Sequence, residues 1–589
     1  MSRLTRFLLH GGALTLAVLV IYLALAPSHI VDGDNAEFAA VGAIGGRPHP
    51  SGYPAYVLYL RLMSWLPGAS PAHTAAIATV LLSAALVFVL HAACRAWGAR
   101  PVAATLAVAL YAASPVVLRM HTEAEVFGPN ALVVATVLWL AAVRGPLRGI
   151  WRVAVLALVA GLGLGNHLTC VMVAPIGLLG AVRGIRETST SKVVTALAGI
   201  VGLAVGLSTY AYLLVADGPI SFGQVDGLGD IYDFFTRADY GGPGAFLPGA
   251  NPVSPWTSEG ALVATLGRAW LWLPGALGLG MLGVGIARPQ ATGETRWGWA
   301  LLLVCWLVAG PVLAFRFNIE PTGLGLYVCQ RFHLLPLLLL TIPVALAFDQ
   351  LGERLAPRIR SERLRSAAFG TGLGVIVFLA LTATSLPWLR GVHSPAMEMG
   401  VRNMLRSMPP DAVIVVNSED LCFGADYLQH ATGERLDVEV ACWLVTSRQW
   451  YRERLRKRGV PVPGAYSLQL TRAQAEAIFA TGRPLFVDRS HMSIITQLPN
   501  YPYGTVVRIL PRGETPPPLH EVIALNRTLF AAFDLDYPRP GWNDDYAATA
   551  HKRYAITWQI LTSALEKVGD KEAAAETLEL AKQLAPVRE

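Results

Sequence analysis

Residues 73–95 read HTAAIATVLLSAALVFVLHAACR, an apolar run whose only charged residue is the final arginine. A helix needs about 20 mostly apolar residues to cross a bilayer, so this run predicts a membrane span. Similar runs elsewhere bring the predicted number of spans to eleven. The predicted spans are 8–27, 73–95, 102–118, 127–143, 152–165, 168–183, 192–216, 261–286, 297–315, 333–349 and 367–388.

The composition agrees with a membrane protein. Of 589 residues, 53% are hydrophobic and 15% are charged, whereas soluble globular chains carry about 25% charge. This excludes an ordinary water-soluble enzyme and a disordered chain. The apolar runs lie in residues 1–388, which we expect to form a mainly α, polytopic membrane domain. We expect a soluble α/β domain at 389–542 and a helical hairpin at 543–589.

The distribution of Lys and Arg predicts the orientation. Alternate short loops, starting from the N-terminus, carry most of these residues, which places the N-terminus in the cytoplasm. The first run ends in Ala24–Ala26, as at a signal-peptide cleavage site, but its length and Pro27 favour an uncleaved span. Two of the predicted spans, 152–165 and 168–183, are short. The alternative to two full spans is that they form one broken pair of helices. The net charge of +7 then reflects topology, and we expect no nucleic acid partner.

With eleven spans, the chain from residue 389 onward lies outside the cytoplasm. We expect a bacterial inner membrane protein with a periplasmic C-terminal domain. In that compartment Cys422 and Cys442 can form a disulfide, and two buried free thiols are the alternative.

The predicted outside loops collect acidic residues near the membrane surface. The first loop contains Asp32, Asp34 and Glu37, and the second contains Glu123 and Glu125. If residues 34–37 are helical, two carboxylates share one face, and their repulsion raises one pKa toward that of a general base. Solvated loop acids are the alternative, which we prefer for Asp32 alone.

Basic and aromatic residues accompany these acids. Arg47 and His49 precede a Pro- and Gly-rich stretch that holds them at the membrane surface, where a positive group suits a lipid phosphate. Arg331 opens the tenth span, and a snorkelling residue is the alternative. His167 lies at a break between apolar runs, where packing is the alternative. The supporting candidates in the fourth loop are Arg237, Asp239 and Tyr240.

Six motifs in order resemble those of a known family. Asp34–Phe38 resembles D-x-G-E-F with Ala36 at the Gly, and His49–Pro54 resembles H-P-P-G-x-P with Ser51 at the second Pro. The other four are Ala124–Phe127, Gly165–His167, Arg237–Gly241 and Arg331–Phe332. Together they resemble GT-C glycosyltransferases, and more closely a multi-pass family that includes the O-mannosyltransferase acting on IPT domains. The resemblance covers about residues 10–340.

The resemblance implies an inverting sugar transfer, mannose being one candidate, from a polyprenyl-phosphate donor to an acceptor hydroxyl outside the cytoplasm. By this resemblance Asp34 matches the general base that deprotonates the acceptor hydroxyl. Glu37 and Glu125 are expected to support this base. The His49 segment matches a loop that approaches the donor phosphate in lipid-A aminoarabinose transferases. Some GT-C members use a divalent metal, but the sequence has no all-acid cage, so we expect no metal or other cofactor.

The last 200 residues carry a different pattern. Short apolar runs at 412–416, 438–442, 484–488 and 505–510 predict strands alternating with helices. Residues 543–585 predict two amphipathic helices, of which the second resembles part of a tetratricopeptide repeat. Packing on the α/β layer is one role for this hairpin, and binding a protein or glycan acceptor is the other.

Two other functions remain open at this point. A transporter or flippase of lipid-linked sugars predicts internal repeats and charges inside spans, and neither is evident. A non-catalytic scaffold that positions the C-terminal domain is the third interpretation.

Overall fold

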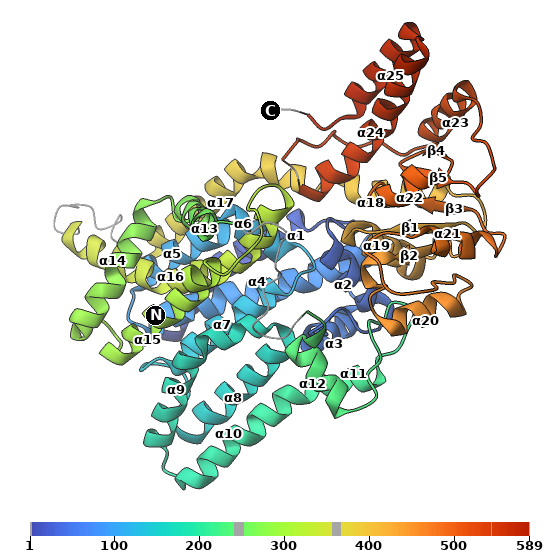
Figure 1. Ribbon diagram of the computed structural model, residues 1–589. Coiled ribbons are helices and arrows are strands. Elements are labelled where there is room, and N and C mark those ends of the chain that lie inside the picture. Colours follow the sequence, from blue (N-terminus) through green and yellow to red (C-terminus); the bar gives the residue numbers. More distant parts are fainter. Residues whose placement is uncertain (1–2, 241–252, 356–366, 544, 588–589) are drawn as a thin grey trace.

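The computed structural model of the protein describes residues 3–240, 253–355, 367–543 and 545–587. Side chains of residues 3–9, 240 and 367–368 lie outside this description, as does the arginine-rich segment 356–366. The chain is mainly helical, with one small sheet near its C-terminal end (Figure 1).

The apolar part of the chain forms long helices and short helical segments. They are α1 (Arg3–Leu25), α4 (Pro71–Ala96), α5 (Pro101–Ala113), α6 (Pro115–Thr122), α7 (Phe127–Ala141), α8 (Gly149–Asn166), η1 (Leu168–Val173), α9 (Ala174–Glu187), α10 (Lys192–Leu207), η2 (Ser208–Ala211), α11 (Tyr212–Val215), α13 (Pro255–Ala269), α14 (Leu273–Ala287), α15 (Arg296–Leu307), η5 (Val308–Val312), α16 (Leu324–Leu355) and α17 (Ala367–Val392).

The described residues contain six helical segments that are long and apolar enough to cross a membrane. Two bent pairs, α5 with α6 and α13 with α14, meet the same criteria together. Shorter apolar helices lie at His10–Leu25, Phe127–Ala141 and Arg296–Val312. Each predicted span falls on one of these segments, and 152–165 and 168–183 fall on two separate ones. That all eleven cross the membrane stays a prediction.

Glycines let α8 and α10 pack closely. A Cβ added to Gly206 would lie 2.7 Å from the Cα of Gly161, which is too close for any side chain. Close backbone approach at small residues is typical of helix pairs in membranes, where burial of apolar surface alone gives no drive to associate.

Short helices occupy the predicted outside loops. They are α2 (Gly33–Ile44), α3 (Pro54–Met63), α12 (Leu228–Thr236) and η3 (Ala238–Tyr240). Asp32 caps α2 by accepting a hydrogen bond from the Asn35 amide, so residues 34–37 are helical, as the shared-face argument requires. Figure 1 shows α2 and α3 at the end of the membrane region that carries the C-terminal part of the chain.

The C-terminal sheet has five strands in the order β2-β1-β3-β5-β4. The strands are β1 (Val413–Val416), β2 (Glu439–Cys442), β3 (Leu485–Val487), β4 (Asn500–Tyr503) and β5 (Val506–Ile509). β1 pairs in parallel with β2 and β3, and β5 is antiparallel to β3 and β4. The four predicted strands appear as β1, β2, β3 and β5. The unpredicted β4 contains Pro502, which an edge strand tolerates because its outer N–H groups need no partner.

The described C-terminal part of the chain also contains ten helical segments. They are α18 (Ala396–Ser407), α19 (Glu419–Asp426), η7 (Tyr427–Ala431), η8 (Trp443–Val445), α20 (Gln449–Lys457), α21 (Arg472–Phe479), α22 (Met492–Gln497), α23 (Leu519–Ala531), α24 (Asp545–Val568) and α25 (Lys571–Leu584). The last two form the predicted helical hairpin. α17 continues to Val392, past the predicted domain boundary at 388.

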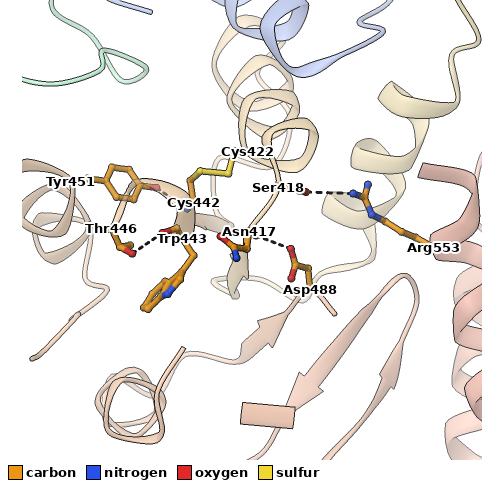
Figure 2. Close-up of a disulfide and its surroundings, with 9 residues drawn as sticks. All are labelled: Asn417, Ser418, Cys422, Cys442, Trp443, Thr446, Tyr451, Asp488 and Arg553. Atoms are coloured by element: carbon orange, nitrogen blue, oxygen red, sulfur yellow. Dashed lines mark hydrogen bonds between the residues drawn. A yellow bond between two sulfur atoms is a disulfide. The ribbon is translucent and has the colours of Figure 1, made fainter. Parts of the chain in front are cut away.

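A disulfide between Cys422 and Cys442 ties α19 to β2 (Figure 2). The Tyr451 hydroxyl accepts a hydrogen bond from the Cys442 amide, which anchors α20 beside the same strand. α19 also packs against α2. The disulfide therefore fixes the helix through which the C-terminal region contacts the loop acids.

Candidate active site

Asp32 is buried and acts mainly as a structural group. Its carboxylate accepts hydrogen bonds from the Asn35 amide at 2.8 Å and the Tyr327 hydroxyl at 2.6 Å. Burial, together with the nearby Glu123 and Asp34 carboxylates, raises the pKa of Asp32 to about 7. The structure thus holds Asp32 as a buried helix cap, and not as the solvated loop acid that we preferred for it from the sequence.

Asp34 forms an ion pair with Arg331 of α16. Arg331 also lies 3.5 Å from the Glu125 carboxylate and 5.1 Å over the Tyr327 ring. Burial opposes ionisation of Asp34, but the Arg331 guanidinium outweighs it and holds the pKa of Asp34 below its ordinary value. Burial and the neighbouring Asp32 raise the pKa of Glu125 well above its ordinary value. Three residues predicted as site residues therefore meet at one point.

Glu37 pairs with His49. One Glu37 oxygen accepts a hydrogen bond from the His49 amide at 2.9 Å, and the other lies 2.6 Å from His49 Nδ1. The Tyr53 hydroxyl lies 2.9 Å from His49 Nε2. The His49 ring stacks on the Phe423 ring, with centroids 6.3 Å apart. Burial lowers the pKa of His49, but the Glu37 carboxylate outweighs it, and the net shift is upward.

We expected repulsion between the Asp34 and Glu37 carboxylates to raise the pKa of one of them. The structure does not show this effect for Asp34. The two residues do lie on α2, three positions apart, but Asp34 pairs with Arg331 and Glu37 pairs with His49. Opposite charges within a few ångströms favour the ionised form. The pKa of Asp34 is consequently lowered, where repulsion between two acids would have raised one of the pair.

Arg47 has different partners from those predicted. Its guanidinium donates hydrogen bonds to the main-chain carbonyls of Leu213, Ala216, Phe222 and Gly223. Such carbonyls need donors where the chain turns at helix ends. This places Arg47 as a clamp on residues 213–223. Its contact with the donor phosphate stays a prediction.

Glu123 joins three segments of the chain. It accepts a hydrogen bond from Arg119 Nε at 3.1 Å and lies 3.0 Å from His393 Nε2. Arg119 in turn pairs with Asp545 at the start of α24 and lies 3.9 Å over the Tyr327 ring. The sequence did not indicate Arg119, which connects Glu123, Asp545 and Tyr327 beside the site.

Replacing Arg119 by methionine should destabilise the protein by about 3–5 kcal/mol, because removing one member of a buried ion pair leaves its partners as unpaired charges. Arg119 and Glu123 are 2% and 0% exposed in their side chains. Thermal unfolding in detergent measures the effect. The matched control is Arg100→Met, since the Arg100 side chain is 53% exposed and its pairs are worth about 1 kcal/mol or less. Equal stability of the two variants would contradict this role.

His167 packs beside the His49 segment. Its ring stacks on Tyr53 with centroids 6.2 Å apart and lies 4.9 Å from the ring of Phe127. Its Nδ1 lies 2.7 Å from the Thr169 hydroxyl and caps η1 by accepting a hydrogen bond from the Thr169 amide at 3.3 Å. These contacts favour the packing alternative for His167.

The fourth-loop candidates lie around the end of α12. Arg237 caps this helix in a left-handed conformation, with φ of 56°, and its charge acts on Asp34 and His49. Asp239 pairs with Arg448 at 2.9 Å, which connects the loop to the C-terminal region. Tyr240 ends η3, and its side chain lies outside the described residues.

The C-terminal region adds an acid that the sequence analysis missed. A Cβ added to Gly33 would lie 3.0 Å from the Cβ of Glu419, so the first turn of α19 rests on the first turn of α2. Burial and Asp34 raise the pKa of Glu419. The available signal was the polar run Asn417–Asp420 directly after a buried strand, because ligands gather at the carboxyl ends of parallel strands.

An apolar pocket opens beside Arg331. It is lined mainly by hydrophobic residues of α7, η1 and α16, with Arg331 as the one charged member among its lining residues. The apolar lining residues are Phe127, Ala131, Met172, Leu313, Phe332, Leu334, Leu335 and Leu338. This arrangement combines a small apolar pocket with a cation that also contacts Asp34.

Comparisons with known proteins bear on this site. Residues 34–192 match the family model described as the protein O-mannosyl-transferase TMEM260 N-terminal domain. No curated protein matches the sequence. Among solved structures, the chain is similar to ArnT from Cupriavidus metallidurans bound to undecaprenyl phosphate and to ArnT in the apo state.

The structural likeness extends over most of both chains. The first alignment covers 86% of this chain and 98% of ArnT, and the second covers 88% and 100%. Both have a TM-score of 0.50 and 13% sequence identity, which shows a shared fold. The family match and this fold together confirm the resemblance of the chain to GT-C glycosyltransferases of the O-mannosyltransferase kind.

Proposed function

We propose that the protein transfers a sugar, mannose on the family match, from a polyprenyl-phosphate donor to an acceptor hydroxyl, with inversion. The observation that carries the proposal is the Asp34–Arg331 pair, whose arginine also lines an apolar pocket. This pairing supports a carboxylate that acts as base beside a guanidinium that binds the donor phosphate. A transporter or a scaffold gives no reason for this pairing.

The donor would lie with its chain in the apolar pocket and its phosphate at Arg331. A guanidinium binds phosphate oxygens through paired N–H groups. The ArnT structure with undecaprenyl phosphate supports a polyprenyl-phosphate ligand for this fold. The Glu37 carboxylate raises the pKa of His49, and His49 also acts on Asp34, so His49 is a second candidate to face the donor phosphate.

Donor binding would release the base. Before binding, Arg331 neutralises Asp34; a phosphate that attracts the guanidinium leaves the Asp34 carboxylate free. The acceptor oxygen then attacks the anomeric carbon, the bond from that carbon to the phosphate oxygen breaks, and Asp34 takes the hydroxyl proton. The bonding electrons leave with the lipid phosphate, whose added charge Arg331 stabilises. The proposal uses no metal ion.

The reaction side follows from two independent features. The excess of Lys and Arg in alternate loops supports a position of α2 and the C-terminal region outside the cytoplasm. The Cys422–Cys442 disulfide supports an oxidising compartment such as the bacterial periplasm. We therefore propose an inner membrane enzyme that acts on its periplasmic face.

The test uses purified protein in proteoliposomes with undecaprenyl-phosphate mannose labelled in the sugar. Added membranes serve as acceptor, and water serves as the acceptor when membranes are omitted. We expect labelled acceptor and free undecaprenyl phosphate. Movement of intact labelled lipid across the bilayer without transfer would instead identify a transporter, and neither activity would identify a scaffold.

A further inference from the structure

The first turn of α24 reaches the candidate active site from the C-terminal region. Asp545 opens this helix and pairs with the buried Arg119 of α6. Further along the same helix, Arg553 pairs with the buried Asp420 in the first turn of α19. Figure 2 shows the Arg553 guanidinium directed at Ser418. Two ion pairs therefore hold α24 between the membrane region and the helix that contacts α2.

Tyr546 contacts the ring over which two arginines of the site lie. The Tyr546 ring meets Tyr327 of α16 edge to face, with centroids 6.0 Å apart. The guanidiniums of Arg119 and Arg331 lie 3.9 Å and 5.1 Å from the centroid of the Tyr327 ring. The Tyr327 hydroxyl donates a hydrogen bond to Asp32 at 2.6 Å. Tyr327 is thus fixed at its hydroxyl by the cap of α2 and at its ring by α24.

Arg331 depends on this ring for its orientation. Its ion pairs with Asp34 and Glu125 both use one nitrogen, Nη1. Its Nε is buried, and no hydrogen-bond partner for that atom lies among the described residues. A guanidinium that is held through one nitrogen can still turn about that contact. The Tyr327 ring limits this turning, because an aromatic face attracts a cation.

Tyr546 also lies within electrostatic reach of the acids in the site. Burial and nearby carboxylates, of which Glu419 has the largest effect, raise the pKa of Tyr546 well above its ordinary value. The other carboxylates are Asp32 and Asp34, and Arg331 acts in the opposite direction. The phenol therefore stays neutral, and we assign no proton transfer to it.

We propose that Tyr546 is a positioning residue of the active site, through which the C-terminal hairpin sets the placement of Arg331. Its ring keeps Tyr327 in the orientation that holds the guanidinium beside Asp34 and ready for the donor phosphate. The inference rests on the proposed function. It gives the hairpin a part in the chemistry in addition to packing on the α/β layer.

The first measurement compares Tyr546→Ala with Tyr546→Phe. Loss of the ring should weaken binding of undecaprenyl phosphate about three- to tenfold, the range of one aromatic pair, and should lower kcat for transfer. Phenylalanine keeps the aromatic edge and should restore wild-type affinity and kcat. A phenylalanine variant as impaired as the alanine variant would mean that the hydroxyl acts, which would overturn the positioning role.

The second measurement repeats Tyr546→Ala in an Arg331→Ala background. If Tyr546 acts through Arg331, the two losses do not add, and the double variant binds undecaprenyl phosphate as weakly as Arg331→Ala. A further loss in the double variant would show that Tyr546 acts by another route, and the proposal would be refuted. The matched control is Tyr466→Ala, which removes an exposed tyrosine of the same region and should behave as wild type.

Unfolding temperatures in detergent distinguish these effects from misfolding. Tyr546→Ala should unfold at a temperature close to that of Tyr466→Ala. If it does not fold, Tyr546→Leu takes its place, because leucine fills part of the same space without an aromatic edge. The leucine variant should show the same losses of affinity and kcat.

Failure of the proposed function gives a different result from failure of the positioning role. A wild type that binds undecaprenyl phosphate without transferring sugar refutes the proposed function, while weaker binding by Tyr546→Ala still supports the positioning role. Wild-type affinity and kcat in Tyr546→Ala refute the positioning role alone. If wild type binds no undecaprenyl phosphate, the proposed function fails, and the unfolding temperatures of the single and double variants test the coupling. Additive changes in these temperatures would overturn it.

Discussion

Replacing Asp34 by asparagine should lower kcat for sugar transfer by about 10²–10⁴-fold, the usual contribution of a general base. The amide still accepts a hydrogen bond from Arg331, so the local geometry is kept, but it cannot take the acceptor proton. Donor binding should not weaken. The measurement is transfer from undecaprenyl-phosphate mannose, alongside equilibrium binding of undecaprenyl phosphate.

The matched control is Asp217→Asn, the same change on a nearby loop, where the carboxylate bonds only its neighbouring Gly218 amide among the described contacts. This variant should keep full activity. Full transfer by Asp34→Asn would remove Asp34 from the mechanism and leave Glu125 as the next carboxylate to test.

The pH profile gives a second measurement on the same residue. Burial opposes ionisation, but Arg331 keeps the pKa of Asp34 below its ordinary value near 4. A base is active when deprotonated, so activity is lost as pH falls through the folded pKa. The Asp34 contribution to kcat/KM, which reports the free enzyme, should therefore stay constant from about pH 5 to 8. An acid limb near pH 7 assigned to Asp34 would show that Arg331 does not pair with it.

The membrane region was predictable because bilayer thickness imposes one simple rule on each helix. Every apolar run of suitable length became helical, although the rule did not anticipate the bends between α5 and α6 (72°) and between α13 and α14 (105°). The prediction that Asp34 and Glu37 lie on one helix was also confirmed. Spacing along one helix gives a shared face, but it says nothing about which charges other elements bring to that face.

The parts of the site that escaped prediction depend on long-range contacts. Arg47 and Arg331 look alike as loop arginines, but only Arg331 reaches Asp34, which is 297 positions away. Glu419 and Asp545 come from helices of the C-terminal region, and no local pattern connects them to α2 or α6. Asn417–Asp420 was visible as a polar run after a strand. Its significance required knowing that α19 packs against α2.

Arg331→Ala should have the second large effect. It removes the proposed phosphate cation and leaves Asp34 and Glu125 without their partner. Loss of one group that stabilises charge in the transition state costs about 10²–10³-fold in kcat, and donor affinity should fall as well. Arg331→Lys should recover part of both, because lysine keeps the charge but lacks the planar pair of donors. The control is Arg144→Ala, an exposed arginine.

Comparing the two variants tests whether Arg331 is exchanged between Asp34 and the donor. If Arg331 must leave the Asp34 carboxylate to bind phosphate, neutralising that carboxylate removes a competitor, so Asp34→Asn should bind undecaprenyl phosphate more tightly than wild type. Arg331→Ala should bind it more weakly. In the double variant the gain from Asp34→Asn should disappear, because no guanidinium remains to be released. A gain that persists without Arg331 would mean that Asp34 repels the phosphate directly, and the exchange step would have to be abandoned.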